Sequence, residues 1–311
     1  MDNKDQSKKI ANLLVIVGPT AVGKTDLSLS IAKKFDGEII SADSRLFYKG
    51  LDIGTAKPSI AERSAVPHHL INICKPDQTL TLGQYQRLAY RAIDDISERG
   101  HLPLLVGGTG QYIMAVVEGW GIPEIAPHPA LRRQLEKLGP EELARWLYEI
   151  DPLAAARIDP RNMRRVVRAL EVALVSGRPI SELQEKTPPP YNVHIIGLHR
   201  DRESLYERID NRVDAMISAG LVQEVAGLRE QGYRAQLPSM SGLGYRQILT
   251  YLRGEMSLDE AVDRIKFETH RFARQQSTWF RQDDPRITWF DLQEDDRGQA
   301  VIADVHNWLG R

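Results

Sequence analysis

The chain has 311 residues, of which 42% are hydrophobic, so it can bury the core of one large domain or of two smaller ones. Its 41 Lys and Arg residues are balanced by 42 Asp and Glu residues, which excludes a strong overall field toward nucleic acid and makes any basic surface local. A single cysteine excludes an internal disulfide, and no apolar run approaches the roughly 20 residues of a membrane helix, so we expect a cytoplasmic protein with no membrane partner.

Residues 1–9 are polar and charged, and they predict a flexible tail without the apolar segment of a secretory signal. Short apolar runs then alternate with helical patterns, of which the early ones are 26–35 and 82–99. The runs that predict buried strands are 13–17, 38–42, 69–74, 102–106 and 193–198, with a sixth candidate at 287–290. This alternation is typical of an α/β fold with a doubly wound parallel sheet.

Only helical patterns lie in the middle of the chain, and one of them runs from about 162 to 176. We therefore predict an all-helical subdomain at 121–190, inserted into a P-loop core formed by 10–120 and 191–311. The last part of that core is mostly helical, with a long helix from 258 to about 281.

Residues 18–25, the P-loop, read GPTAVGKT and complete the phosphate-binding pattern G-x-x-x-x-G-K-[ST] directly after the strand at 13–17. A strand that passes through a tight glycine turn into a helix points several backbone N–H groups and the positive helix end at one anion. Lys24 adds a positive charge, and the Thr25 hydroxyl is a ligand for Mg²⁺. The residues predicted to bind phosphate are Gly18, Pro19, Thr20, Ala21, Val22, Gly23, Lys24 and Thr25.

Asp43 closes the second predicted strand, at the sheet edge where ligands of parallel sheets gather. The P-loop and the glycine turn 107–110 fall at the same edge, so the three should share one crevice. The strand at 102–106 ends in Gly-Gly-Thr-Gly and lacks the acidic residue with which P-loop NTPases hold Mg²⁺. That absence argues against ATP hydrolysis and leaves Asp43 as a base, an indirect metal ligand or a turn cap.

Four arginines, Arg161, Arg164, Arg165 and Arg168, have offsets that place them on one face of a helix. Like charges three or four residues apart repel one another by about 0.2–0.5 kcal/mol per pair. The cluster is either a solvated face or a contact for a polyanion. In a chain of net charge −1 we favour a nucleic-acid backbone as its partner.

Three more arginines can reach the predicted crevice. Arg208 and Arg212 lie one helical turn apart after the strand at 193–198, and either can approach the phosphate site. Arg246 follows a glycine-rich turn and can approach the same site or contact a nucleic-acid strand.

Six segments together resemble one family, the tRNA dimethylallyltransferases, also called tRNA isopentenyltransferases. The segments are GPTAVGKT (18–25), ISADSRLFYKGLDIGTAKP (40–58), LLVGGTGQY (104–112), RRVVRALE (164–171), RIDNRVDAM (208–216) and SGLGYRQ (241–247). The matching stretches, which include these six, run from residue 18 to 281, which is most of the chain. The P-loop alone is shared by many enzymes, whereas its combination with ADSRLFYKGLDIGTAKP and LVGGTG is specific.

The resemblance implies transfer of a dimethylallyl group from dimethylallyl diphosphate to N6 of the adenosine that is 3′-adjacent to the anticodon of tRNA, with release of diphosphate. The P-loop would then hold the diphosphate leaving group with Mg²⁺ on Thr25. Asp43 would be the general base, and Lys24 and Arg212 would assist the leaving group. The implied partners are dimethylallyl diphosphate and the anticodon stem-loop of tRNA, and we expect the protein to be a monomer.

The resemblance also implies residues that contact tRNA. Those expected around the target adenosine and on the insertion, together with Arg246, are Asp43, Ser44, Arg45, Leu46, Thr109, Arg132, Arg164, Arg165, Val166, Val167 and Arg168. Phe47 and Tyr48 can either stack on the base or belong to the core.

Three other functions remain open from the residues alone. A P-loop kinase acting on a nucleotide or small metabolite would consume ATP, but nothing in the sequence supplies its arginine-rich lid. An isopentenyltransferase acting on free AMP or ADP would gain little from an arginine helix in a separate subdomain. A tRNA-binding protein that only senses nucleotide would not require Asp43.

Overall fold

The computed structural model describes residues 10–293 and 297–310, so the predicted tail at 1–9 lies outside the described residues. By its internal contacts the chain divides into two compact units. The first consists of Met1–Ile113 and Pro190–Arg311, and the second of Met114–Pro189, which begins earlier than the expected boundary at 121. None of the described helices is long and apolar enough to span a membrane.

Six strands form one parallel sheet in the first unit, as the alternating pattern predicts, with the order β3-β2-β4-β1-β5-β6. The strands are β1 (Ala11–Val17), β2 (Gly37–Ser41), β3 (His68–His69), β4 (Leu102–Gly107), β5 (Tyr191–His199) and β6 (Ile287–Asp291). The expected strand at 69–74 is wrong in its extent. Leu70 and Asn72 have φ angles of 59° and 57°, which an extended strand cannot contain.

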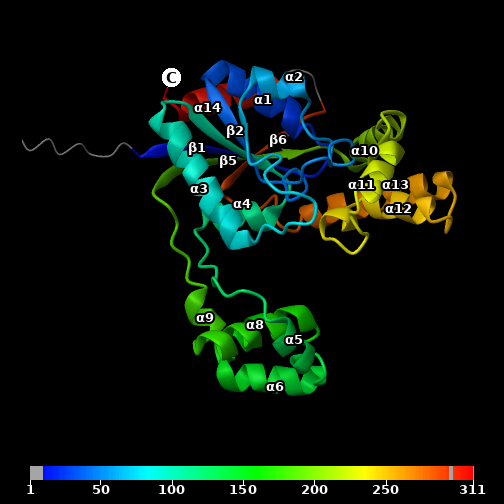
Figure 1. Ribbon diagram of the computed structural model, residues 1–311. Helices are drawn as coiled ribbons and strands as arrows, with labels where there is room; N and C mark the ends of the chain where they lie inside the picture. Colours follow the sequence, from blue (N-terminus) through cyan, green and yellow to red (C-terminus); the bar gives the residue numbers. More distant parts are fainter. Residues whose placement is uncertain (1–9, 294–296, 311) are drawn as a thin grey trace, which may run out of the picture. The chain divides into compact units, whose positions relative to one another are not determined.

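Helices of the first unit lie on both faces of the sheet, and those between β5 and β6 form a cluster beside it (Figure 1). They are α1 (Lys24–Phe35), α2 (Ile60–Ala65), α3 (Leu82–Glu98), α4 (Gly110–Val117), α10 (Arg202–Ser218), α11 (Leu221–Glu230), α12 (Tyr245–Leu252), α13 (Leu258–Gln276) and α14 (Arg297–Trp308). Helix α13 ends before the expected residue 281, because the N–H groups of Thr278 and Trp279 bond three residues back and tighten the chain into a turn.

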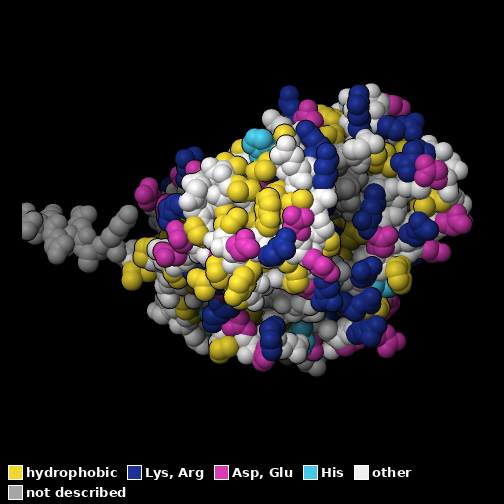
Figure 2. All heavy atoms as spheres, turned by 90° about the horizontal axis from the view of Figure 1, so that it is seen from below, with side chains coloured by type: hydrophobic (Ala, Val, Ile, Leu, Met, Phe, Trp, Pro, Cys, Tyr) yellow, Lys and Arg dark blue, Asp and Glu magenta, His cyan; other side chains and the backbone are white. Residues whose placement is uncertain are grey.

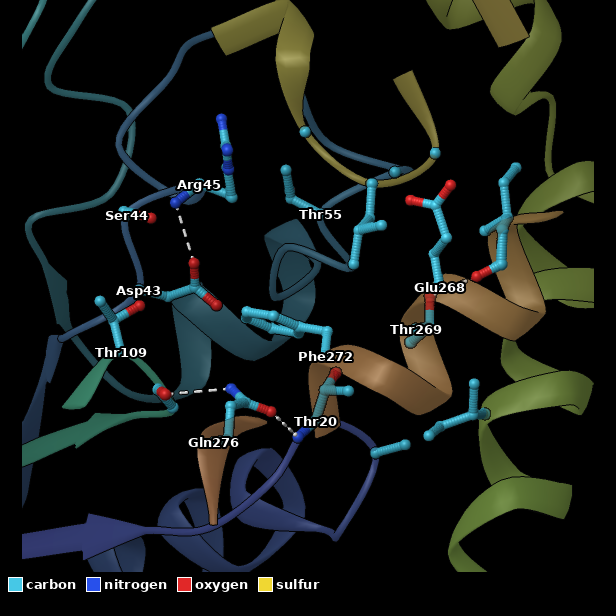
Figure 3. Close-up of a pocket in the computed structure, with 18 of the residues that line it drawn as sticks. Thr20, Asp43, Ser44, Arg45, Thr55, Thr109, Glu268, Thr269, Phe272 and Gln276 are labelled. Atoms are coloured by element: carbon cyan, nitrogen blue, oxygen red, sulfur yellow. Dashed lines mark hydrogen bonds between the residues drawn. The ribbon is translucent and has the colours of Figure 1, made fainter. Parts of the chain in front are cut away.

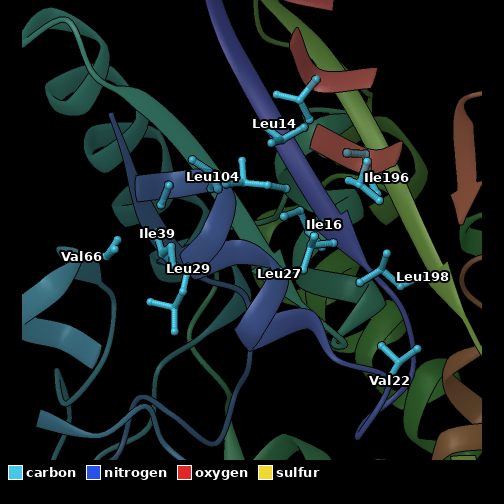
Figure 4. Packing of buried hydrophobic residues seen from close by; sticks show 14 of the residues in the cluster. Leu14, Ile16, Val22, Leu27, Leu29, Ile39, Val66, Leu104, Ile196 and Leu198 are labelled. Carbon is cyan, nitrogen blue, oxygen red and sulfur yellow. The ribbon is translucent and has the colours of Figure 1, made fainter. Parts of the chain in front are cut away.

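The central strands form because their apolar runs are buried on both faces of the sheet. Side chains of β1, β4 and β5, including Leu14, Leu104 and Ile196, are fully buried and pack against α1, from which Leu27 and Leu29 project (Figure 4). On the surface shown in Figure 2, basic and acidic side chains lie among one another. The packed strands hold their carboxyl ends, and the loops that follow them, at one edge.

The second unit is all-helical, and it has its own core. Its helices are α5 (Pro129–Leu135), α6 (Pro140–Ile150), α7 (Pro152–Arg157), α8 (Met163–Ser176) and α9 (Ile180–Leu183). Asp151 caps α7 by accepting from the Ala154 N–H, and its other carboxylate oxygen accepts from the Ser181 N–H of α9. One buried carboxylate thereby ties two short helices together.

Candidate active site

The P-loop forms a tight turn between β1 and α1. Gly18 has a φ of 146°, and a Cβ at this position would lie 2.6 Å from the Leu198 carbonyl oxygen, so the strand-to-loop transition requires glycine. Gly23, with a φ of 117°, precedes the first turn of α1. The ammonium group of Lys24 donates to the carbonyl oxygens of Gly18 and Pro19, at 2.9 and 2.7 Å, so the lysine folds back over the loop.

Two cationic side chains and one carboxylate lie partly buried beside this loop. Burial lowers the pKa of Lys24 to about 7; nearby Asp43 opposes that shift, and Arg212 adds to it. Burial also lowers the pKa of Arg212, and Asp43 again acts in the opposite direction. One carboxylate cannot balance two desolvated cations, so this place attracts an anion.

These groups line a cavity of about 240 Å³, the phosphate cavity, together with Thr25 and Arg208. Two arginines brace the P-loop through its backbone: Arg208 donates to the Ala21 carbonyl oxygen at 2.8 Å, and Arg200 donates to the Val22 carbonyl oxygen at 3.0 Å. Arg208 and Arg212 thus both approach the phosphate site, as their place in the sequence predicts.

The donor set of the phosphate cavity suits Mg²⁺. Thr25 and Asp43 supply the hard oxygen atoms that Mg²⁺ prefers. Within the residues that the structure describes, no three His, Cys, Asp or Glu side chains lie close enough together to hold a metal ion by themselves. A magnesium ion at this place would complete its coordination with water or with oxygen atoms of a bound phosphate.

A second, larger cavity of about 650 Å³, the acceptor cavity, adjoins the first. Asp43 and Thr109 lie side by side on one wall, and α13 forms the opposite wall (Figure 3). The Arg45 N–H donates to a carboxylate oxygen of Asp43 at 2.8 Å and fixes its orientation. The residues that line both cavities are Thr20, Ala21, Asp43, Thr55, Gly108, Arg212, Phe272 and Gln276.

Gln276, which sequence reasoning missed, bridges the two loops that meet at this junction. Its side-chain carbonyl accepts from the Thr20 N–H at 2.8 Å, and its amide group donates to the Gly108 carbonyl oxygen at 3.0 Å (Figure 3). The side chain is buried, so both its polar ends are satisfied within the protein. No periodicity marks this residue, because a glutamine at the end of a polar helix looks solvent-exposed.

Comparison with known proteins agrees with this arrangement. The family model for IPP transferase matches residues 46–283, and the model for isopentenyl transferase matches residues 11–75. A tRNA dimethylallyltransferase from Roseiflexus sp. (strain RS-1) is 53% identical, over 96% of this chain and 98% of its own. The chain belongs to the tRNA dimethylallyltransferase family.

Solved structures of this family have the same fold. A full-length tRNA isopentenylpyrophosphate transferase from Bacillus halodurans is 42% identical and covers 96% of this chain and 97% of its own, with a TM-score of 0.72. A eukaryotic dimethylallyltransferase, described as acting on tRNA, is 28% identical and covers 96% of this chain and 80% of its own, with a TM-score of 0.85. The predicted P-loop α/β fold with a helical insertion is confirmed.

The structure distributes the residues expected around the target adenosine over both cavities. Ser44, Arg45 and Thr109 line the acceptor cavity, whereas Leu46 lines the phosphate cavity. Arg246 also lines the acceptor cavity and forms an ion pair with Glu268 of α13. That Ser44, Arg45, Leu46, Thr109 and Arg246 contact the substrate stays a prediction for this member of the tRNA dimethylallyltransferase family.

The aromatic pair after the Asp43 segment belongs to the core. Phe47 and Tyr48 are 2% and 7% exposed, and the Phe47 ring lies 5.4 Å from that of Tyr85 and 5.6 Å from that of Tyr112. Neither side chain is free to stack on a base.

The expectation that Arg161, Arg164, Arg165 and Arg168 share one face of a helix is wrong for Arg161, because α8 begins at Met163. Arg161 precedes α8 and pairs with Asp159 at 2.8 Å. Arg168 pairs instead with Glu171, whose fully buried carboxylate also binds Arg132. Arg132 and Arg168 thereby connect α5 to α8 through Glu171. The spacing of arginines along the sequence could not show this contact.

Two valines expected to contact tRNA have buried side chains. Val166 and Val167 are 1% and 4% exposed and belong to the core of the insertion, so their side chains cannot reach RNA. Arg164 and Arg165 are exposed on α8, and no acidic side chain among the described residues pairs with either of them. They are the best candidates on α8 for a phosphate contact.

The lowered pKa of Lys24 predicts that binding of inorganic diphosphate takes up a proton at Lys24. Above pH 7 the buried lysine is mostly neutral, and a bound anion returns its pKa toward the ordinary value. Calorimetric titration in buffers of different ionisation enthalpy measures this uptake. At pH 8 we expect wild type to take up about 0.9 proton more than Lys24→Met, and the difference to fall to about 0.1 at pH 6.

Lys24→Met controls for protons released or bound by the diphosphate itself. Equal uptake by the two proteins at pH 8 would show that Lys24 is already charged before the anion binds.

Proposed function

We propose that the protein transfers a dimethylallyl group from dimethylallyl diphosphate to N6 of the adenosine 3′-adjacent to the anticodon of tRNA and releases diphosphate. One observation carries this proposal: the Asp43 carboxylate lines both a cationic phosphate cavity and a larger acceptor cavity. A base at this junction lies between a leaving diphosphate and an incoming nucleophile. The family to which the chain belongs supports the same reaction.

Asp43 accepts the proton that N6 loses in the proposed reaction. The N6 lone pair forms the new C–N bond to the allylic carbon, the C–O bond breaks, and its electron pair leaves with the diphosphate. The lone pair of an exocyclic amine is delocalised into the adenine ring, so N6 becomes acidic only as the C–N bond forms. Asp43, oriented by the Arg45 N–H, accepts that proton.

The phosphate cavity stabilises the negative charge that grows on the leaving group. Lys24 and Arg212 are desolvated, and the P-loop directs backbone N–H groups toward the same place. Because the charge on the bridging oxygen increases as the C–O bond breaks, these fixed groups bind the transition state more strongly than the substrate. A Mg²⁺ ion held by the Thr25 hydroxyl would neutralise part of the diphosphate charge.

The target adenosine must leave the stack of the anticodon loop to enter the acceptor cavity. Asp43 and Thr109 would face its amine or ribose, while Arg45 would line the pocket beside it. The exposed Arg164 and Arg165 of the insertion would contact tRNA phosphates and so position the substrate without reading its sequence. We further propose that the enzyme acts as a monomer in the cytoplasm.

An acceptor assay tests this function against its alternatives. With labelled dimethylallyl diphosphate and Mg²⁺, we expect label in unmodified tRNA and none in AMP, because AMP cannot make the contacts proposed for Arg164 and Arg165. No ATP should be consumed, because the reaction splits only the C–O bond of dimethylallyl diphosphate. Label in AMP but never in tRNA would establish a free-nucleotide enzyme. ATP consumption with transfer of its phosphate would establish a kinase.

Asp43→Asn should slow single-turnover transfer roughly 10²- to 10⁴-fold, the usual range for a positioned base. Asparagine keeps an oxygen for the Arg45 N–H but does not accept the proton from N6. Binding of tRNA and of inorganic diphosphate should persist, which separates a failure of the chemical step from misfolding. If Asp43→Asn transferred the dimethylallyl group at a nearly normal rate, Asp43 would not be the general base.

Replacement of both Arg164 and Arg165 by alanine should weaken tRNA binding and flatten its salt dependence. The slope of log K against log salt concentration should fall by roughly 0.7 to 0.9 for each phosphate that the variant no longer neutralises. Arg178→Ala is the matched control, because Arg178 is an exposed arginine of the same unit that pairs with Glu182. If the double variant and wild type had the same slope of log K against log salt concentration, Arg164 and Arg165 would be ordinary solvent-exposed residues that do not contact tRNA phosphates.

A further inference from the structure

Phe272 is an aromatic side chain that faces the two cavities instead of the core. It is 39% exposed, and its neighbours on the cavity side of α13 include the polar residues Glu268, Thr269 and Gln276. Its ring points from α13 toward the Asp43 carboxylate (Figure 3). An apolar ring exposed to water loses the stabilisation that burial would provide, so its placement favours an apolar partner at this position.

The junction of the cavities defines which part of the substrates meets this ring. Among the eight side chains that line both cavities, Phe272 is the only large apolar one in the described structure; the others are polar or charged, or are alanine or glycine. Diphosphate would occupy the side with Lys24, and the adenine amine would lie beside Asp43. The group between them is the alkyl group in transfer.

We propose that the face of Phe272 stabilises the dimethylallyl group while it carries positive charge in the transition state. This inference rests on the proposed function and assigns a catalytic residue to the same site. As the C–O bond breaks before the C–N bond is complete, positive charge spreads over the allylic carbons. The negative face of an aromatic ring attracts a cation most strongly where water is excluded.

An uncharged group can stabilise the alkyl cation here without disturbing the pairing of the cationic side chains with the diphosphate. Arg212 serves the diphosphate but lines both cavities, so its positive charge lies close to the group in transfer. A second carboxylate there would compete for the two cations. An aromatic face supplies a negative potential without a net charge, and it cannot be alkylated as readily as an oxygen or nitrogen nucleophile.

Two substitutions at position 272 separate charge stabilisation from simple apolar contact. Phe272→Leu keeps an apolar side chain but removes the ring, and we expect kcat to fall about 10- to 30-fold, the range of a desolvated cation–π interaction. Phe272→Trp restores an aromatic face and should keep kcat within about threefold of wild type, although it is bulkier. The KM for tRNA and the affinity for inorganic diphosphate should be nearly unchanged in both.

Phe267→Leu is the matched control, because Phe267 is a more exposed phenylalanine of the same helix, at 65%, and does not line either cavity. Its kcat should equal that of wild type. Wild-type kcat for Phe272→Leu, or a kcat for Phe272→Trp that falls as far as that of Phe272→Leu, would overturn the assignment. Transfer by wild type is measured first, so failure of the proposed function shows as no labelled tRNA from any of the proteins.

Discussion

The desolvation of Lys24 and Arg212, which lie partly buried beside a single carboxylate, Asp43, is the constraint on which the site depends. Their positive charges repel each other and one carboxylate compensates them only in part, so Lys24 gives up its proton near pH 7. The parallel sheet makes this possible, because its packed strands hold the P-loop and the Asp43 segment at the same edge. An anion with several negative oxygens relieves this repulsion, and we therefore regard the diphosphate as the partner that completes the site.

The second half of the chain adds the wall of the acceptor cavity to this phosphate site. Helix α13 supplies Gln276, which bonds to Thr20 of the P-loop although 256 positions separate the two residues. The same helix supplies Phe272 at the junction of the cavities and Glu268, the partner of Arg246. A P-loop without this helix would hold phosphates, but it would lack the wall that faces Asp43 and encloses the transferred group.

The insertion uses its arginines for two different purposes. Glu171 is fully buried, and hydrogen bonds from Arg132, Arg168 and the His128 N–H keep its pKa low, at about 2, despite the burial that opposes them. Removing Glu171 would take the carboxylate partner from Arg132 and Arg168 at once, so this carboxylate is structural. The surface available to tRNA phosphates on α8 is consequently smaller than the number of arginines in the sequence indicates.

The sequence by itself determined the features that depend on short stretches of chain: the P-loop, the apolar strands and the place of Asp43 at a strand end. Glycine geometry and apolar runs act locally, so they are visible without the fold. Only the tertiary structure decided that Val166 is core, that Arg168 binds Glu171, and that Gln276 and Phe272 reach the site. Spacing along a helix shows which residues share a face, but what that face packs against depends on segments far away in the chain.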